Sequence, residues 1–271
     1  LADEAGLEEL WLWEDCFLAG GLSSAAIALS HSANLTVGVG VLPVPMRNVA
    51  LAAMEIATLE RAFPGRVRIG VGHGVQDWMA QIGERVASPM TLLREYLTCL
   101  TALLRGDRVT FHGRYVNLDD VGLDWPPTAG AEVLAAATGP KTLRLSGELA
   151  SGTVLSGGTT PDGVRKALTE IRAGGELRTE PARHSVVTYV LCATGPTADA
   201  DLRAEIEHWE LEPAEDVGVA GDAAQVAAGV RRWGDAGADT VVLQPSADVA
   251  IEDFVRFVGA EVGGVLARAG C

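Results

Sequence analysis

Residues 36–42 have the sequence Thr-Val-Gly-Val-Gly-Val-Leu, followed by Pro43. Each residue of this stretch is β-branched, apolar or glycine, so both faces of the expected strand are nonpolar. Strands of this kind are typical of parallel sheets that helices cover on both sides. A helical pattern over residues 49–62 follows. The stretch therefore predicts one β-α unit of an α/β fold.

The same alternation extends along the rest of the chain. Strands are expected over residues 10–15, 35–43, 66–74, 132–138, 152–158, 186–194 and 240–245. Helices are expected over residues 22–32, 49–62, 90–105, 140–149, 162–173, 199–209, 223–236 and 251–269. A doubly wound sheet and a closed (β/α)8 TIM barrel both fit this order. We favour the barrel, as a single domain over residues 1–271.

Two details qualify the barrel prediction. Seven strands are expected, and the chain opens at Leu1–Gly6 like the end of a helix, so we expect the first barrel strand upstream of Leu1. Residues 107–127 also break the alternation. Two alternating runs around His112–Gly113 predict a hairpin, which the Pro-Pro sequence at 126–127 ends. We interpret residues 107–127 as an insertion between barrel units.

Composition restricts the function. The 36 acidic and 21 basic residues give a formal charge of −15, which argues against a nucleic-acid partner. The four cysteines are far apart in sequence and form no CxxC or Cys/His pair, so we expect no disulfide framework and no metal site. No apolar run approaches the roughly 18 residues of a membrane span. We therefore expect a cytoplasmic protein that does not bind membranes.

Active sites of parallel barrels lie at the carboxyl ends of the strands. Two acids, Glu14 and Asp15, end the first expected strand, and His73 lies between two glycines at the end of the third. Carboxylates and imidazoles are the usual proton carriers in enzymes. A solvated or helix-capping acid and a structural histidine fit the same pattern. We take Glu14, Asp15 and His73 as the candidate catalytic residues.

A second group of residues predicts a site for an anion. Thr138, Gly139 and Pro140 join a strand to a helix, and the exposed amides at such a helix start favour a phosphate. Ser156 and Gly157 follow the next strand and leave room for a ligand. An ordinary βα turn fits both stretches as well. The chain contains no GxxxxGK[ST], HExxH or GxSxG motif, which argues against kinases, zinc proteases and serine hydrolases.

Several short motifs occur in an order that is specific as a set. They are Ala5–Trp11, Gly38–Leu42, Pro45–Arg47, Gly65–Gly72, Gly139–Lys141, Ala150–Gly152, Gly221–Asp222 and Ala236–Val242. Together they resemble the bacterial luciferase-like monooxygenase family, which includes the oxidoreductases that depend on the deazaflavin coenzyme F420. The resemblance covers nearly the whole chain.

The resemblance implies a (β/α)8 barrel that forms a homodimer, with Trp11, Trp13 and Trp78 as candidate aromatic surface. It also implies a non-prolyl cis peptide at Gly40–Val41, behind the ring of a flavin or deazaflavin. The cofactor phosphate would lie on the amides around Thr138, Gly139 and Pro140. The residues that would line the cofactor or substrate are Gly72, His73, Gly74, Ser156 and Gly157.

The chain departs from the family at one place. Where deazaflavin members usually have Asp-His, this sequence has Glu14-Asp15. A histidine proton donor therefore cannot be carried over, and neither can a sugar-phosphate dehydrogenase activity. We expect Glu14 to contact the cofactor head group and His73 or Asp15 to carry protons.

Three functions fit the resemblance. The one we favour is hydride transfer between coenzyme F420 and a small organic substrate. The second is monooxygenation dependent on FMN, and the third is a flavin-binding relative without catalysis. In the first two the cofactor performs the redox step, while the protein supplies position and electrostatics.

Overall fold

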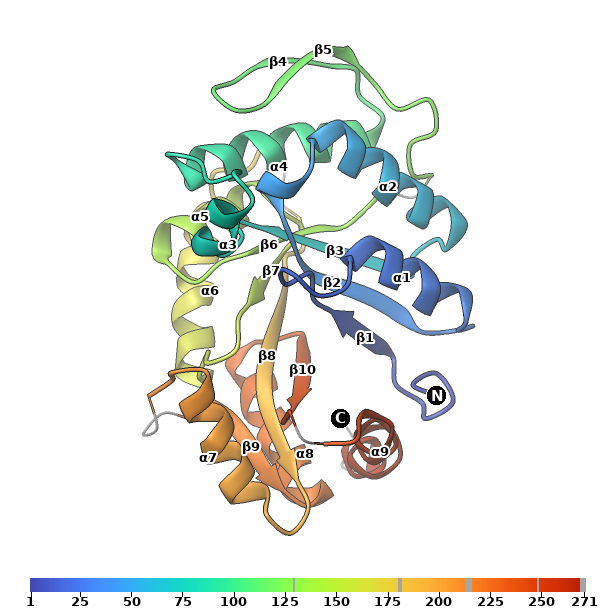
Figure 1. The fold of residues 1–271 in the computed structure, drawn as a ribbon, viewed down its shortest axis with the longest axis vertical. Helices are drawn as coiled ribbons and strands as arrows, with labels where there is room; N and C mark the ends of the chain where they lie inside the picture. Colours follow the sequence, from blue (N-terminus) through green and yellow to red (C-terminus); the bar gives the residue numbers. More distant parts are fainter. Residues whose placement is uncertain (129, 180–181, 213–215, 248, 269–271) are drawn as a thin grey trace. The chain divides into compact units, whose positions relative to one another are not determined.

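The computed structural model describes residues 1–128, 130–179, 182–212, 216–247 and 249–268, which fall into two compact units. The first unit comprises Glu9–Val154 and Glu170–His184. The second comprises Leu1–Glu8, Leu155–Thr169 and the described part of Ser185–Cys271. We describe each unit by itself (Figure 1).

The first unit is built on parallel strands that pair in the order in which they occur in the chain. They are β1 (Glu9–Leu12), β2 (Thr36–Pro43), β3 (Val67–Gly72), β6 (Val133–Ala136) and β7 (Gly152–Leu155, in this unit to Val154). The helices between them are α1 (Gly21–Ser30), α2 (Val49–Ala62), α3 (Gln76–Gln81), α4 (Pro89–Arg105) and α5 (Pro140–Leu149). Val37, Val39, Ile69 and Leu134 are fully or almost fully buried, because helices cover the sheet.

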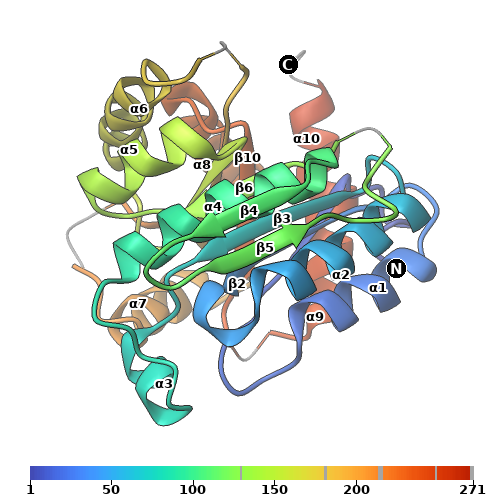
Figure 2. The ribbon, with the colours of Figure 1, turned by 90° about the horizontal axis from the view of Figure 1, so that it is seen from above.

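The expected hairpin is confirmed as β4 (Val109–His112) and β5 (Asn117–Val121), which pair antiparallel. It lies over α4 in both views (Figures 1 and 2). Glu95 of α4 anchors the turn, because its carboxylate accepts hydrogen bonds from three backbone N–H groups at residues 114–116. Burial opposes ionisation of Glu95, but these donors hold its pKa below the usual value.

In the second unit, the ten-residue strand β8 (Ser185–Thr194) pairs in parallel with two partners, β9 (Gly218–Gly221) and β10 (Thr240–Pro245). The helices are α6 (Pro161–Gly175), α7 (Ala198–His208), α8 (Ala223–Ala236), α9 (Ile251–Arg256) and α10 (Gly263–Arg268), with a π-helical turn over Phe257–Val262. Leu191, Ile206 and Val217 form part of its core. α6 contributes residues to both units.

The predicted β-α alternation is confirmed, and the helices over residues 49–62, 140–149 and 223–236 have the expected bounds. Strand ends differ from the expectation. The strand expected over residues 10–15 ends at Leu12, and Glu14 lies beyond it, where its carboxylate bonds to Arg47. The expected count of seven strands in the alternation missed β9, a four-residue strand with glycine at both ends. The short helix α3 was also missed. Among the described residues, no helix is both long and apolar enough to cross a bilayer.

Glu60, at the end of α2, makes the stability of the chain depend on pH. Its carboxyl is buried, and burial together with the negative charge of Glu132 raises its pKa to about 7, against a backbone N–H donated by Gly65. The folded state therefore holds a proton that the unfolded state releases near pH 4.5. Stability that is present below this pH is lost as the pH rises through 7.

We expect Glu60→Gln to raise the free energy of unfolding at pH 8 by about 1–2 kcal/mol, with a much smaller change at pH 5. Glutamine keeps the oxygen that accepts from Gly65 and carries no charge. Urea unfolding at both pH values measures the difference, and Glu84→Gln, at an exposed glutamate, is the matched control. An equal effect of Glu60→Gln at both pH values would contradict this assignment.

Candidate functional site

The carboxyl ends of β1, β2, β3 and β6 lie at one edge of the first unit, because these strands are parallel and adjacent. The segments that follow them are residues 13–20, 44–48, 73–75 and 137–139. They contain half of the predicted site residues. This edge is where parallel α/β folds bind ligands.

Glu14 is buried and fully engaged within the protein. Arg47, which follows β2, donates from Nη1 to Oε1 at 2.5 Å and from Nη2 to Oε2 at 3.0 Å. The backbone N–H of Gly21, at the start of α1, donates to Oε2 at 2.7 Å. All three donors belong to the chain itself, so both carboxylate oxygens of Glu14 already have hydrogen-bond partners. Its geometry ties the β1 loop to the β2 loop and to α1.

Asp15, the next residue, differs in its surroundings. Its side chain is half-buried, and within the described residues no hydrogen bond or ion pair engages its carboxylate. Burial raises the pKa of Asp15 above its usual value. Of the two adjacent acids, Asp15 is therefore the one whose carboxylate has no partner among the described residues.

His73 lies between β3 and α3 and reaches the first turn of α5. Its Nε2 is 3.4 Å from the Thr142 hydroxyl, while its buried Nδ1 has no hydrogen-bond partner of normal geometry. Burial lowers the pKa of His73, and a hydrogen bond with the backbone of Pro89 opposes this lowering in part. The imidazole is therefore neutral at pH 7 and is suited to accept a proton. The structure brings this residue together with the predicted phosphate turn.

The middle of β2 contains the cis peptide Gly40–Val41, which confirms the sequence expectation. The pairing of β2 with β3 is irregular between Val39 and Leu42. Here Val41 lies over β3: a Cβ atom added to Gly72 would be 2.9 Å from Val41 Cγ2 and 3.1 Å from Ala136 Cβ. Gly72 leaves the space that Val41 fills. The surface across these three strands is consequently made of small and branched apolar groups.

The start of α5 has the features expected of an anion site. Gly139 is the N-cap residue, no side chain caps the helix, and an added Cβ atom at Gly139 would meet no heavy atom within 4 Å. Pro140 occupies the first helical position and has no N–H, as expected from the sequence. The orphan donors of this turn are the amides of Gly139, Lys141 and Thr142. Thr138 is exposed beside them.

Ser156 and Gly157 belong to the second unit and form a turn after β7 rather than the end of a strand. The Ser156 carbonyl accepts a hydrogen bond from Thr159 Oγ1 at 2.8 Å. Within this unit the nearest group to a Cβ atom added at Gly157 is Oε1 of Gln244, at 3.8 Å. The remaining glycine of the prediction, Gly74, has a φ of +70° and lies against Met79 and Pro43.

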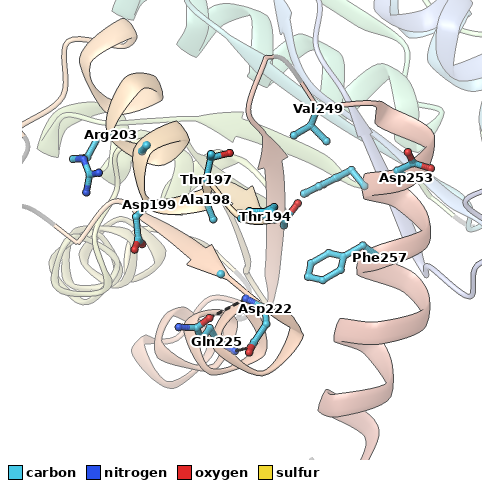
Figure 3. Close-up of a pocket in the computed structure, with 15 residues that line it drawn as sticks. Thr194, Thr197, Ala198, Asp199, Arg203, Asp222, Gln225, Val249, Asp253 and Phe257 are labelled. Atoms are coloured by element: carbon cyan, nitrogen blue, oxygen red, sulfur yellow. Dashed lines mark hydrogen bonds between the residues drawn. The ribbon is translucent and has the colours of Figure 1, made fainter.

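A cavity of about 870 Å³ lies in the second unit, at the carboxyl ends of β8 and β9 (Figure 3). Asp199 and Arg203 come from α7, and Asp253 from the opposite wall. Asp222 caps α8 and exchanges hydrogen bonds with Gln225. Three aspartates against one arginine disfavour an anionic ligand. These residues are not among those predicted from the sequence to form a site.

Sequence reasoning also missed Arg47 as a site residue. Its position in the Pro45–Arg47 motif is visible in the sequence, but its partnership with Glu14 spans 33 residues. Only the pairing of β1 with β2 brings the two side chains together.

Residues 1–244 of the chain match the family model described as "Luciferase-like monooxygenase". The chain is 26% identical over 275 residues to an F420-dependent glucose-6-phosphate dehydrogenase of Beutenbergia cavernae, which covers 94% of this chain and 71% of the relative. Other curated relatives are matched over only about half of their own length.

Solved structures share the fold. An F420-dependent secondary alcohol dehydrogenase, solved with an F420-acetone adduct, superposes with a TM-score of 0.84 at 19% identity, over 97% of this chain and 92% of that one. The oxygenating constituent of 3,6-diketocamphane monooxygenase from Pseudomonas putida, solved with FMN, gives a TM-score of 0.74 at 16% identity, over 97% and 90% of the two chains. These similarities confirm the predicted luciferase-like α/β fold class.

Gly72 and Gly139 should respond differently to the addition of one methyl group. We expect Gly72→Ala to lower the free energy of unfolding by about 1–3 kcal/mol, because the new Cβ would overlap Val41. We expect Gly139→Ala to leave stability nearly unchanged, since its φ of −87° and open surroundings accept alanine. Urea unfolding of both variants provides the measurement. Equal losses in the two variants would contradict the described packing.

Proposed function

Since the chain belongs to the luciferase-like monooxygenase family, we propose that it is an oxidoreductase that transfers a hydride between coenzyme F420 and a small organic substrate. The observation on which this rests is the uncapped start of α5 beside His73, at the same edge as the surface around Val41. An anionic cofactor with a flat ring fits such an edge. The F420-dependent relatives support this choice of cofactor.

The residues of the chain have distinct proposed roles. The amides of Gly139, Lys141 and Thr142, with the Lys141 ammonium, would bind phosphate of the coenzyme. Gly40, Val41 and Gly72 would form the wall behind the ring. Ser156 and Gly157, in the second unit, stay predicted cofactor residues. When bound, the deazaflavin gives or accepts the hydride at a ring carbon. Protein groups supply orientation and exclude water.

Proton transfer is proposed for the two candidates that keep a usable lone pair or proton. Asp15 would hold or release a proton near the reacting group, because burial favours its protonated form. His73, neutral at pH 7, would accept a proton or a hydrogen bond. Glu14 would act as a positioning residue through Arg47 rather than by direct contact with the coenzyme.

A second candidate function is monooxygenation with FMN. The structural neighbour that contains FMN favours it, since the same fold accepts that cofactor. FMN also has a phosphate for the start of α5. The two functions therefore differ in the ring that is bound, and a binding measurement separates them.

We expect fluorescence titration to show tight binding of F420 and much weaker binding of FMN. Gly139→Ala should weaken F420 binding about tenfold, because its methyl group would occupy the space next to the phosphate. Gly234→Ala, another glycine with open surroundings, is the matched control. Micromolar binding of FMN alone would refute hydride transfer with F420, and binding of neither cofactor would favour a non-catalytic relative.

We further propose that the chain forms a homodimer in the cytoplasm. Exposed apolar side chains gather on α1 and α2, which lie side by side (Figure 2): Ile27 is 64% and Met54 58% exposed. Trp11 is engaged within the chain, with the Arg68 guanidinium 5.3 Å from its ring. The described free cysteines Cys16, Cys99 and Cys192 suit a reducing compartment.

Sedimentation of the wild type should give the mass of two chains. Ile27→Asp combined with Met54→Asp should shift it to one chain, because charges would be buried in the interface. A single-chain mass for the wild type at micromolar concentration would refute the dimer.

A further inference from the structure

Two neighbouring loops at the carboxyl edge of the first unit expose apolar side chains. Trp13, Phe17 and Leu18 follow β1 and are 38%, 63% and 79% exposed, and Met46 follows β2 and is 37% exposed. Cys16 joins the two loops, since its Sγ is 3.6 Å from Met46 Sδ. We call Trp13, Phe17, Leu18 and Met46 the apolar rim. Exposed apolar groups clustered beside a functional edge indicate a binding surface.

Hydrogen bonds anchor both loops that carry the apolar rim. Glu14, between Trp13 and the exposed part of the loop, is held by Arg47 and by the backbone N–H of Gly21. The next loop is held by the same guanidinium. Because both loops are anchored, a ligand that covers the rim has little backbone to order, which favours binding of apolar groups.

Charges around the rim argue against an anionic substrate. Residues 13–20 contain no lysine or arginine, and Arg47 is the one cation of residues 44–48. Arg47 is already paired with Glu14 and lies 3.6 Å from Glu55. A phosphorylated substrate needs cations or free amide donors for its phosphate. The uncapped start of α5 is already assigned to the phosphate of the coenzyme.

We propose that the substrate is a neutral organic molecule whose aliphatic or aromatic body rests on the apolar rim, and not a sugar phosphate. This inference rests on the proposed function, because the rim adjoins the surface assigned to the coenzyme. It separates this chain from the relatives named glucose-6-phosphate dehydrogenases. Phe17 and Leu18 become residues that determine substrate specificity.

The test is ligand-observed NMR on the full chain, with and without F420, using cyclohexanone and glucose 6-phosphate as probes. We expect cyclohexanone to bind and glucose 6-phosphate neither to bind nor to compete. The double variant Phe17→Ser and Leu18→Ser should weaken cyclohexanone binding about tenfold. Leu177→Ser, at a leucine that is 68% exposed outside the rim, should leave it unchanged.

Three results would overturn the proposal: binding of glucose 6-phosphate, cyclohexanone affinity that the rim variant does not change, or a rim variant that converts a dimer into single chains. The last would make the rim an interface with a second copy. The F420 titration distinguishes failure of the substrate proposal from failure of the proposed function. If F420 binds and cyclohexanone does not, only the substrate proposal fails. If cyclohexanone binds the rim and F420 does not bind, the proposed function fails.

Discussion

The ion pair of the buried Glu14 with the partly buried Arg47 organises the carboxyl edge of the first unit. It joins the loops after β1 and β2, and the contact with Gly21 extends the tie to the start of α1. Removal of Arg47 would leave the buried Glu14 carboxylate without its cationic partner, which is costly in proteins. The pair also distinguishes the two adjacent acids. The Glu14 carboxylate is bonded within the chain, whereas among the described residues no hydrogen bond or ion pair engages the Asp15 carboxylate.

The edge combines two kinds of surface with opposite preferences. The start of α5 offers amide donors and Lys141 beside the neutral His73, and it suits an anionic group. In the described loops that carry the apolar rim, the one cation, Arg47, is paired with Glu14. The rim and the surface around Val41 therefore suit uncharged apolar groups. A cofactor with a phosphate and a ring would span both. The acidic cavity of the second unit has the opposite charge preference, so we give it no part in binding the coenzyme.

Local patterns were sufficient to predict the β-α alternation, the hairpin over residues 109–121 and the bounds of three helices, because periodicity and Gly/Pro punctuation act over short distances. The cis peptide at Gly40–Val41 came from family resemblance and not from local chemistry. The role of Gly72 was harder to predict, since it depends on the position of Val41 on a neighbouring strand. The partnership of Glu14 with Arg47 was missed for the same reason. Single-domain organisation and the roles of the site residues stay predictions.

The most direct measurement is a crystal structure of the full chain with coenzyme F420. We expect the phosphate on the amides of Gly139, Lys141 and Thr142, the ring against Val41, and Glu14 still paired with Arg47. A coenzyme whose phosphate lies elsewhere, or a Glu14 released from Arg47 to contact the ring, would contradict this expectation.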